Sequence, residues 1–278
     1  MITNEKHLYY ILKADNNTIQ NIIDNIDDYY ISWEKLKLLP NGKYKTRQLN
    51  TTKPEFKKIQ KRIYNFLLEK VNISDYSYGG IRKKDNVINA KQHQGNKYIF
   101  TTDLKKFFPS ISHNQVFQLF LELGVTPKIS RILTQLTTYK SELPQGVPTS
   151  TLLANLVFKK TGDKIFDFAK CNNMKFTTFV DDLTISSKID FKDKIPAIIK
   201  IITNDGYKIS RKKTNYKTKN PTITGVVCQN NKLKLENSVY KRIAKLKKQK
   251  DKNSNDTTVT NKYNGLLLYR KKIENANN

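Results

Sequence analysis

The sequence has few of the cysteines and histidines that form disulfides and histidine-based metal sites. Only Cys171 and Cys228 occur among its 278 residues, at no close spacing, which argues against a disulfide framework and a zinc site. The three histidines, His7, His93 and His113, are too few and too scattered for a histidine metal centre. Because so few cysteines with no pairing pattern are typical of a reducing compartment, we expect a cytoplasmic protein.

Long apolar runs are also missing. No stretch approaches the roughly 20 apolar residues that a membrane-spanning helix needs, and the sequence does not open on a signal-peptide pattern. We therefore expect no membrane partner.

Acidic residues are scarce beside basic ones. The chain has 24 Asp and Glu against 51 Lys and Arg, which gives a formal charge of +27. An excess of this size, spread over most of the length, favours a polyanionic partner such as nucleic acid. A general bias toward lysine explains part of the charge, but it does not explain the shortage of acids.

Among these few acids, two are adjacent. Asp181 and Asp182 lie in the β-prone run Thr177–Ser187, and a third acid, Asp103, ends the β-rich run Tyr98–Thr102. Two carboxylates about 4 Å apart in a partly buried turn would repel by about 4 kcal/mol, a cost that a divalent cation removes. The pair therefore indicates a two-metal site for nucleotidyl transfer, with an exposed acidic hairpin as the alternative.

The spacing of apolar residues and of turn signals predicts an α+β protein with a central antiparallel sheet. We expect helices over residues 18–38, 54–71, 127–138, 150–170, 194–204, 238–250 and 260–273, and from Ser112 onward. We expect strands over residues 43–49, 98–102, 222–228 and 232–235, and a hairpin around the aspartate pair.

Four segments occur in an order that identifies a family. They are Thr102–Ile111, Leu143–Ser150, Phe179–Asp182 and Lys212–Thr214, and together they resemble the signature blocks of reverse transcriptases. Asn89–His93 resembles the Asn-Ala-x-x-His element of bacterial retron enzymes, and Thr222–Val227 resembles their Val-Thr-Gly segment, with isoleucine in place of valine. The chain is thus similar to bacterial retron-type reverse transcriptases.

The resemblance implies a right-hand polymerase fold. We expect N-terminal helices and fingers over residues 1–97, a palm with the central sheet over residues 98–228, and a small helical thumb over residues 229–278. Finger helices would be inserted into the palm around residues 112–145. No maturase-like or endonuclease extension is expected after the thumb.

The same resemblance assigns the catalytic residues. Two Mg²⁺ ions would be held by the three carboxylates and one backbone carbonyl, contributed by Asp103, Leu104, Asp181 and Asp182. Lys213 would stabilise or protonate the leaving pyrophosphate, although its neighbour Lys212 is an alternative in so lysine-rich a chain. Phe179 replaces the family's usual tyrosine, which removes a hydroxyl that can contact the primer.

Residues that bind the nucleotide and the nucleic acid also follow from the resemblance. Phe107 and Phe108 are both candidates for dNTP binding, with Phe108 as the steric gate against a ribonucleotide 2′-OH. The alternative is that both rings are core aromatics. The remaining candidates for dNTP binding are Lys45, Arg47, Gln145 and Gly146, and those for nucleic-acid binding are Asn89, His93, Tyr240, Lys241, Arg242, Lys245 and Lys248. A solvated helix face is the alternative for the residues beyond 237.

The implied function is RNA-directed DNA synthesis with dNTPs. Retron relatives copy a structured noncoding RNA, start from an internal 2′-OH, and often act with an effector protein in anti-phage defence. Another bacterial reverse transcriptase with different priming, including a group II intron-like enzyme, is the first alternative. An RNA-dependent RNA polymerase and a non-enzymatic RNA-binding protein are the others; Phe108 disfavours the former, and the ordered acids disfavour the latter.

Overall fold

The structure is a computed structural model that describes residues 2–38, 44–229, 231–253 and 256–277. The backbone divides into two compact units. Unit 1 contains residues 1–74 and 106–160, and unit 2 contains residues 75–105 and 161–278. The expected domain boundaries near residues 97 and 228 remain predictions, and the two units are described separately below.

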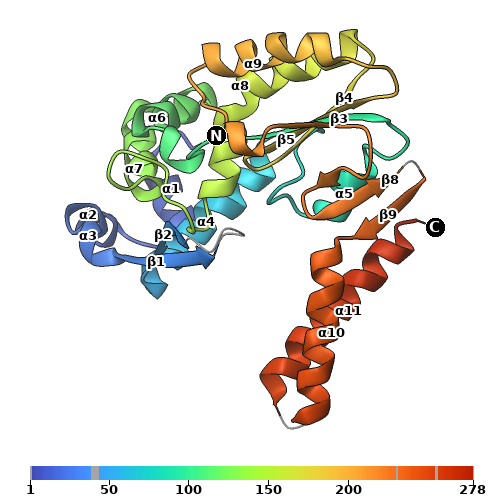
Figure 1. Cartoon of the computed structure of the whole chain (residues 1–278). Coiled ribbons are helices and arrows are strands. Elements are labelled where there is room, and N and C mark those ends of the chain that lie inside the picture. Colours follow the sequence, from blue (N-terminus) through green and yellow to red (C-terminus); the bar gives the residue numbers. More distant parts are fainter. Residues whose placement is uncertain (1, 39–43, 230, 254–255, 278) are drawn as a thin grey trace. The chain divides into compact units, whose positions relative to one another are not determined.

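Unit 1 is mainly helical and contains one two-stranded sheet (Figure 1). Its helices and strands, in chain order, are α1 (Glu5–Leu12), α2 (Asn16–Asp24), α3 (Ile26–Tyr29), β1 (Tyr30–Leu38), β2 (Tyr44–Thr52), α4 (Pro54–Lys70), the 3₁₀ turn η1 (Phe108–Ser110), α6 (His113–Glu122) and α7 (Pro127–Thr137). The long helix α8 (Ser150–Cys171) begins here, and the boundary between the units falls inside it.

The helix expected over residues 18–38 is wrong in its second half. The chain leaves the helical conformation after Tyr29, and β1 pairs antiparallel with β2 from Tyr30, opposite Thr52, to Leu38, opposite Tyr44. The run Tyr-Ile-Ser-Trp is rich in β-branched and aromatic residues, which fit a pleated strand better than a helix.

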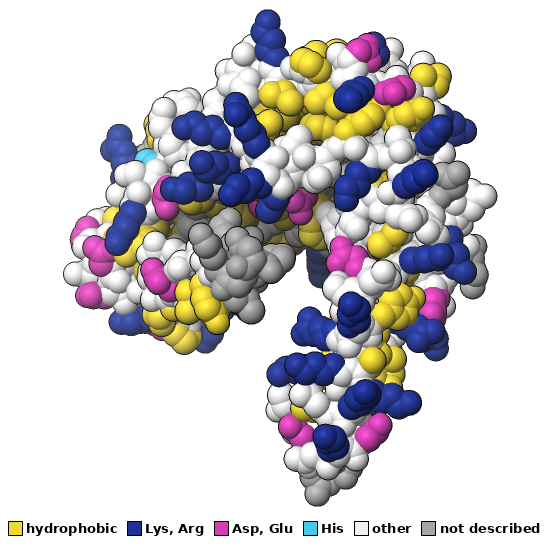
Figure 2. All heavy atoms as spheres, in the orientation of Figure 1, with side chains coloured by type: hydrophobic (Ala, Val, Ile, Leu, Met, Phe, Trp, Pro, Cys, Tyr) yellow, Lys and Arg dark blue, Asp and Glu magenta, His cyan; other side chains and the backbone are white. Residues whose placement is uncertain are grey.

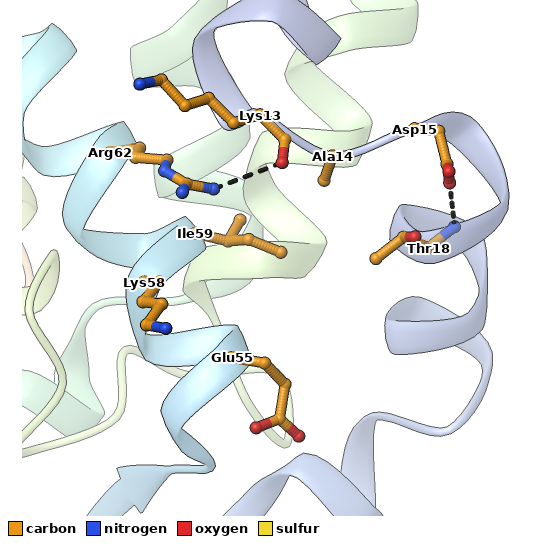
Figure 3. Close-up of a pocket in the computed structure, with 8 residues that line it drawn as sticks. All are labelled: Lys13, Ala14, Asp15, Thr18, Glu55, Lys58, Ile59 and Arg62. Carbon is orange, nitrogen blue, oxygen red and sulfur yellow. Dashed lines mark hydrogen bonds between the residues drawn. The ribbon is translucent and has the colours of Figure 1, made fainter.

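The helices of unit 1 start where their capping residues predict. The Ser112 hydroxyl and the Gln115 side chain form a capping box at α6, and proline occupies the first turn of α4 and α7. Arg62 of α4 donates a hydrogen bond to the Leu12 carbonyl at the end of α1, with an N–O distance of 2.5 Å. A pocket of about 410 Å³ lies beside this contact, between α4 and the start of α2 (Figure 3).

Unit 2 is built on an antiparallel four-stranded sheet in the order β4-β5-β3-β6. Its elements before the C-terminal sheet are α5 (Asn86–Lys91), β3 (Tyr98–Asp103), β4 (Lys175–Phe179), β5 (Asp182–Ser187), η2 (Lys192–Lys194), α9 (Ile195–Asn204), η3 (Arg211–Lys213) and β6 (Asn215–Lys217). The C-terminal part of α8 and helix α9 lie side by side over this sheet (Figure 1), joined by the Lys164–Asp205 ion pair.

A second, three-stranded sheet follows in unit 2, in the order β7-β8-β9. It is formed by β7 (Thr222–Ile223), β8 (Val226–Gln229) and β9 (Lys232–Leu235). The single strand expected over residues 222–228 is therefore wrong, because Thr224 and Gly225 both have positive φ and turn the chain between β7 and β8.

The chain finishes with two antiparallel helices, α10 (Asn237–Lys252) and α11 (Thr257–Asn275), which confirm the two expected basic helices. The N-terminal end of α10 and the C-terminal end of α11 pack on the three-stranded sheet and on α5. The buried members of this cluster are Val87, Ala90, Ile99, Ile223, Val226, Cys228, Leu233, Leu235 and Ile273. Within the described ranges, no helix combines the length and the apolar character needed to cross a membrane.

Candidate active site

Three carboxylates meet at one edge of the four-stranded sheet. Asp103 ends β3 and lies directly opposite Asp182, which begins β5, while Asp181 occupies the turn before β5. One oxygen from each of the three side chains lies within 4.8 Å of the others. The Leu104 amide donates to the Asp181 carbonyl at 2.9 Å, which joins the end of β3 to the turn. Pairing of β3 with β5 thus brings together residues that are distant in the sequence.

The turn that carries the aspartates has an unusual backbone. Val180 has a φ of +60°, a conformation that β-branched residues rarely adopt and that costs about 1–3 kcal/mol. The segment containing Gly79 lies against this turn, because Tyr78 donates its amide to the Thr178 carbonyl at 2.8 Å. A Cβ on Gly79 would lie 2.5 Å from the Val180 nitrogen, so only glycine fits there.

Burial and a neighbouring charge both act on Asp181 in the carboxylate cluster. Burial, and then the neighbouring charge of Asp103, raise the pKa of Asp181 above its ordinary value. Both causes disfavour the ionised form and would be offset by a bound cation. Oxygen donors at this spacing are the ligands that Mg²⁺ prefers, so the donor set fits a divalent metal.

Lys213 is the cation nearest this cluster that the structure describes in an ion pair, and it contacts Asp103 through its ammonium group. Its position is set by the segment that precedes β6. The Ser210 amide donates to the Asp103 carbonyl at 2.8 Å, and the hydroxyls of Thr214 and Thr102 are 2.8 Å apart. The Lys213 side chain as a whole is about half exposed.

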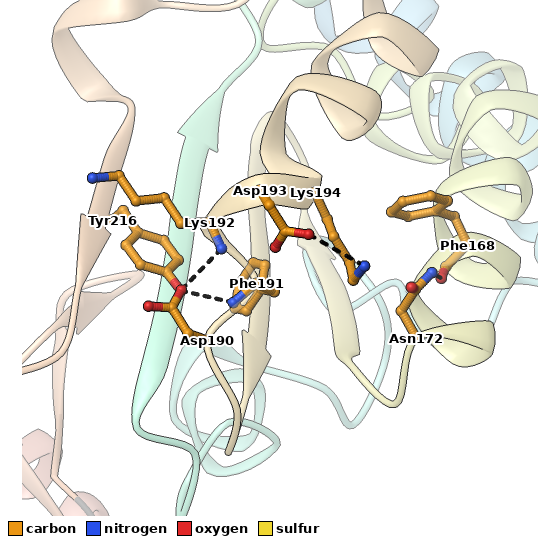
Figure 4. Close-up of polar contacts among 8 residues, drawn as sticks. All are labelled: Phe168, Asn172, Asp190, Phe191, Lys192, Asp193, Lys194 and Tyr216. Carbon is orange, nitrogen blue, oxygen red and sulfur yellow. Dashed lines mark hydrogen bonds and ion pairs between the residues drawn. The ribbon is translucent and has the colours of Figure 1, made fainter.

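The strand β6 is itself fixed by Tyr216, whose hydroxyl donates to the Asp190 carboxylate at 2.6 Å (Figure 4). The same hydroxyl accepts from the Phe191 amide at 3.1 Å. Partial burial and the bond to Asp190 raise the pKa of Tyr216 to about 12, so it stays a donor at neutral pH. These bonds hold the strand that follows Lys213.

The two phenylalanines after Asp103 have different environments in unit 1. Phe107 is buried and packs edge-on against Phe158, with ring centroids 5.8 Å apart. Phe108 is only half-buried and begins the 3₁₀ turn η1. The expectation that Phe107 contacts the nucleotide is therefore corrected by its burial. Phe108 keeps part of its ring open to contact, and its role as a steric gate stays a prediction.

The Gln145–Gly146 loop packs against strand β2 in unit 1. The Gln145 carbonyl accepts from the Asn50 amide at 2.8 Å. Gly146 has a φ of +118°, and a Cβ there would lie 2.6 Å from the Asn50 carbonyl oxygen. The close approach of loop and strand therefore needs glycine at this position.

Lys45 and Arg47 lie on β2, opposite Lys37 and Lys35. Their side chains fall outside the described residues, so their contact with a triphosphate stays a prediction.

Asn89 and His93 do not face solvent. Their side chains are 1% and 0% exposed, and both imidazole nitrogens of His93 are bonded to hydroxyls, those of Ser186 and Thr177, at 2.7 Å. Complete burial lowers the pKa of His93 to about 3, so the ring is neutral. The expectation that these two side chains bind nucleic acid directly is corrected by their burial.

The candidate residues on α10 are exposed. Lys241, Arg242, Lys245 and Lys248 are open to solvent, and Tyr240 lies under the guanidinium of Arg270 with 6.0 Å between group and ring centre. Basic side chains are conspicuous along the α10–α11 pair in Figure 2. This surface carries the charge that a phosphate backbone would contact, although a solvated helix face would look the same.

Sequence reasoning missed several residues that shape the site. Gly79, Val180 and Thr214 position the aspartate turn and Lys213, yet none carries a reactive group. Val180 and Thr214 lie within the signature blocks, but the resemblance gives them no role, and the Gly79–Gly80 pair is equally typical of an ordinary turn.

Comparison with known proteins agrees with this geometry. The model of the family "Reverse transcriptase (RNA-dependent DNA polymerase)" matches residues 37–233, a span that contains all three carboxylates, Lys213 and the Gln145–Gly146 loop.

Several curated relatives are retron reverse transcriptases. The Retron Ec86 enzyme of Escherichia coli is 34% identical over 68% of this chain and 60% of its own length. The Retron Se72 enzyme of Salmonella heidelberg (strain 579083-10) is 30% identical over 62% of this chain and 46% of its length, and the Retron Mx162 enzyme of Myxococcus xanthus is 27% identical over 57% and 36%.

The matches thus span less than two thirds of each of these three relatives. Because the family model covers more than half of the chain and the signature blocks lie within the matched span, the chain belongs to the reverse transcriptase family, and its curated relatives are the retron reverse transcriptases of bacteria.

Proposed function

We propose that the protein is an RNA-directed DNA polymerase. The observation that carries this proposal is the convergence of Asp103, Asp181 and Asp182 at the ends of neighbouring strands, within a span that matches the reverse transcriptase family. Acids collected at a sheet edge beside a lysine provide what nucleotidyl transfer needs: a metal site and a cation for the leaving group.

Asp103, Asp181 and Asp182 would hold two Mg²⁺ ions, with the Leu104 carbonyl as a further ligand. Bound magnesium would activate the primer hydroxyl and neutralise charge on the phosphates. Lys213 then has two successive partners. It pairs with Asp103 in the structure described here, and during catalysis its ammonium would turn toward the leaving pyrophosphate and donate a proton to it.

Nucleotide selection would use residues of unit 1. Phe108 would exclude the 2′-OH of a ribonucleotide, supported from behind by the buried ring of Phe107. The Gln145–Gly146 loop would contact the incoming nucleotide, and Lys45 and Arg47 would bind its triphosphate.

The template would be a structured noncoding RNA, as the resemblance to retron enzymes implies, and the α10–α11 surface would bind the RNA or the RNA–DNA duplex through its phosphates. We further propose that synthesis starts from an internal 2′-OH and that the product acts with an effector protein in anti-phage defence. The free cysteines Cys171 and Cys228 suit the reducing cytoplasm, where we place the reaction.

Primer extension with purified protein tests the proposed activity. Asp103→Asn and Asp181→Asn should each lower the rate of dNTP incorporation by about 10³-fold or more, because each removes a metal ligand. Asp193→Asn is the matched control, since this carboxylate is largely exposed and the ion pair described for it is with Lys194. Normal extension by both ligand variants would overturn the proposal.

Substitution of the gate tests the choice of sugar. Phe108→Val should raise incorporation of rNTPs relative to dNTPs by about tenfold or more, because a smaller side chain admits the 2′-OH. Phe107→Leu serves as the comparison, since this ring belongs to the core, and it should affect stability rather than sugar choice. Unchanged discrimination in Phe108→Val would remove the steric-gate role. Sequencing the nucleic acid that copurifies with the protein tests the retron-like template.

A further inference from the structure

One face of the short helix α5 packs against other parts of unit 2. Its first turn is capped by Asp85, whose carboxylate accepts from the Val87 and Ile88 amides at 2.8 and 3.0 Å. Val87 and Ala90 are at most 1% exposed and belong to the apolar cluster with β8, β9 and Ile273 of α11. The retron-like Asn-Ala-x-x-His element lies on this helix and on the residues that follow it.

At one end, α5 contacts the turn between β7 and β8, where the second retron-like segment lies. The Asn86 side-chain amide donates to the Thr224 carbonyl at 3.0 Å, and the Asn89 amide donates to the Thr224 hydroxyl at 3.3 Å. Thr224 adopts a φ of +46°, which turns its carbonyl and hydroxyl toward the helix. The two short elements that resemble retron sequences are therefore in direct contact.

The same end of α5 is bonded to the last helix of the chain. Asn86 also donates to the Tyr269 hydroxyl at 2.6 Å, and Asp85 forms an ion pair with Lys272 at 2.6 Å. Tyr269 and Lys272 both lie on α11, beside Ile273 of the apolar cluster. Polar and apolar contacts thus attach the α10–α11 pair to α5.

The residues that follow the C-terminal end of α5 form hydrogen bonds with the two strands that flank the catalytic turn. His93 bonds the Thr177 hydroxyl on β4 and the Ser186 hydroxyl on β5, and Asn96 donates to Ser186 as well, all at 2.7 Å. Thr177 lies four residues before Asp181, and Ser186 lies four residues after Asp182. One neutral ring therefore links both strands of the hairpin at equal sequence distance from the aspartates.

From these contacts we infer that residues 85–96 form an internal strut that positions the catalytic hairpin relative to the α10–α11 helices. The inference rests on the proposed polymerase function. Asn86, Asn89 and His93 are positioning residues in it: they do not touch nucleic acid, but they fix the distance between the surface that would hold the duplex and the carboxylates that would act on its primer end. Errors of about 1 Å at such a site are sufficient to lower rates by about a hundredfold.

Comparison of RNA binding with catalysis tests this inference. His93→Ala should lower kcat for primer extension by about tenfold, leave the KM for dNTP unchanged, and keep the Kd for a template RNA within about twofold of the wild-type value at every salt concentration. Measurements are made well below the melting temperature of each variant. His7→Ala is the matched control, because His7 is exposed on α1.

Two further variants keep the test decisive if His93→Ala does not fold. Tyr269→Phe removes only the hydroxyl that accepts from Asn86, and Thr224→Val removes only the hydroxyl that bonds Asn89 and the Asn86 carbonyl. Each should shorten the products made per binding event by about two- to fivefold, as the loss of one or two partly buried hydrogen bonds implies, with unchanged RNA affinity. Tyr10→Phe, at a ring that is 81% exposed, is the control.

Double-mutant cycles distinguish a positioning role of these residues from a general loss of stability. His93→Ala and Ser186→Ala should be strongly non-additive in kcat, whereas His93→Ala and Tyr269→Phe should be non-additive in product length. A weakened Kd for RNA, or a reduced salt slope, in any of these variants would overturn the inference, because those are the signs of lost phosphate contacts. Additive effects with unchanged product length would overturn it as well.

Failure of the polymerase proposal would be recognised separately. If the wild-type protein and Asp181→Asn show the same lack of extension, the proposed function fails. The strut can still be tested without activity, by the non-additivity of His93→Ala and Ser186→Ala in the melting temperature and by the RNA affinities of the variants.

Discussion

The catalytic hairpin and the α10–α11 helices use charge in opposite ways. At the hairpin, three acids are held on short, paired strands, and a single glycine contact and a single strained residue determine their geometry. On α10, several lysines and an arginine project into solvent from one helix. In the first region the geometry depends on a few residues, whereas in the second the positive charge is shared by many. We therefore expect single substitutions to have very different effects in the two regions.

Glycine substitutions should show the largest contrast between the regions. Gly79→Ala places a Cβ 2.5 Å from the Val180 backbone nitrogen, so the aspartate turn must move, and we expect about a hundredfold loss of kcat. Gly265→Ala lies within α11 with open space around its Cβ, and alanine there should stabilise the helix by up to about 1 kcal/mol. Extension assays and thermal melts of both variants measure the contrast, and equal behaviour of the two would contradict it.

Removal of the repulsion at the hairpin should stabilise the protein in the absence of metal. The pKa of Asp181 is raised in the folded protein, so its contribution to stability is fully present below its unfolded pKa and is lost as the pH rises through the folded value. Asp181→Asn carries no charge and does not suffer this loss. The variant should therefore melt higher than the wild type at neutral pH, by roughly 2–4 °C for each kcal/mol.

Two controls sharpen the prediction for Asp181→Asn. Its advantage should disappear near pH 3, where the wild-type carboxyl is also protonated, and it should shrink when Mg²⁺ is added, because the ion binds the wild-type folded state. A wild-type protein that is more stable than the variant at pH 7 without metal would show that the carboxylates do not repel.

Single charges on α10 should have the smallest effects. Lys245→Gln should weaken RNA binding only about two- to threefold and lower the salt slope of log K by about 0.7–0.9, the contribution of one phosphate contact. Replacing Lys241 and Lys248 as well should multiply the losses. Fluorescence anisotropy across a salt series measures this, with Lys6→Gln on α1 as the control. A loss of all binding from one lysine would mean that the helix makes a specific contact.

Local and long-range contacts differ in how well the sequence predicts them. The family resemblance, and not the local pattern, predicts that Asp103 lies near the Asp181–Asp182 pair. The capping residue Ser112 and the proline at 127 are local signals, and they mark helices that the structure confirms. Local patterns of this kind report on neighbours in the chain, so they work where structure is local.

The errors lie where distant contacts decide the structure. The apolar spacing of residues 18–38 predicts a helix, but residues 30–38 form β1 because they pair with β2, a later segment of the chain. The break at Thr224 depends on bonds to Asn86, which is far away in the sequence. The family resemblance suggests that His93 binds nucleic acid, and its polar side chain gives no local sign of burial. Hydrogen bonds to the hydroxyls of Thr177 and Ser186, which are distant in the sequence, allow its ring to be buried.

Metal binding tests the central claim most directly. Titration of Mn²⁺ followed by electron paramagnetic resonance should show ions bound by the wild-type protein with template, primer and dNTP present, with binding strongly weakened in Asp103→Asn, Asp181→Asn and Asp182→Asn and unaltered in Asp193→Asn. If the three ligand variants bound Mn²⁺ as the wild type does, the converging carboxylates would not be the metal site, and the account of this protein as a two-metal polymerase would be contradicted.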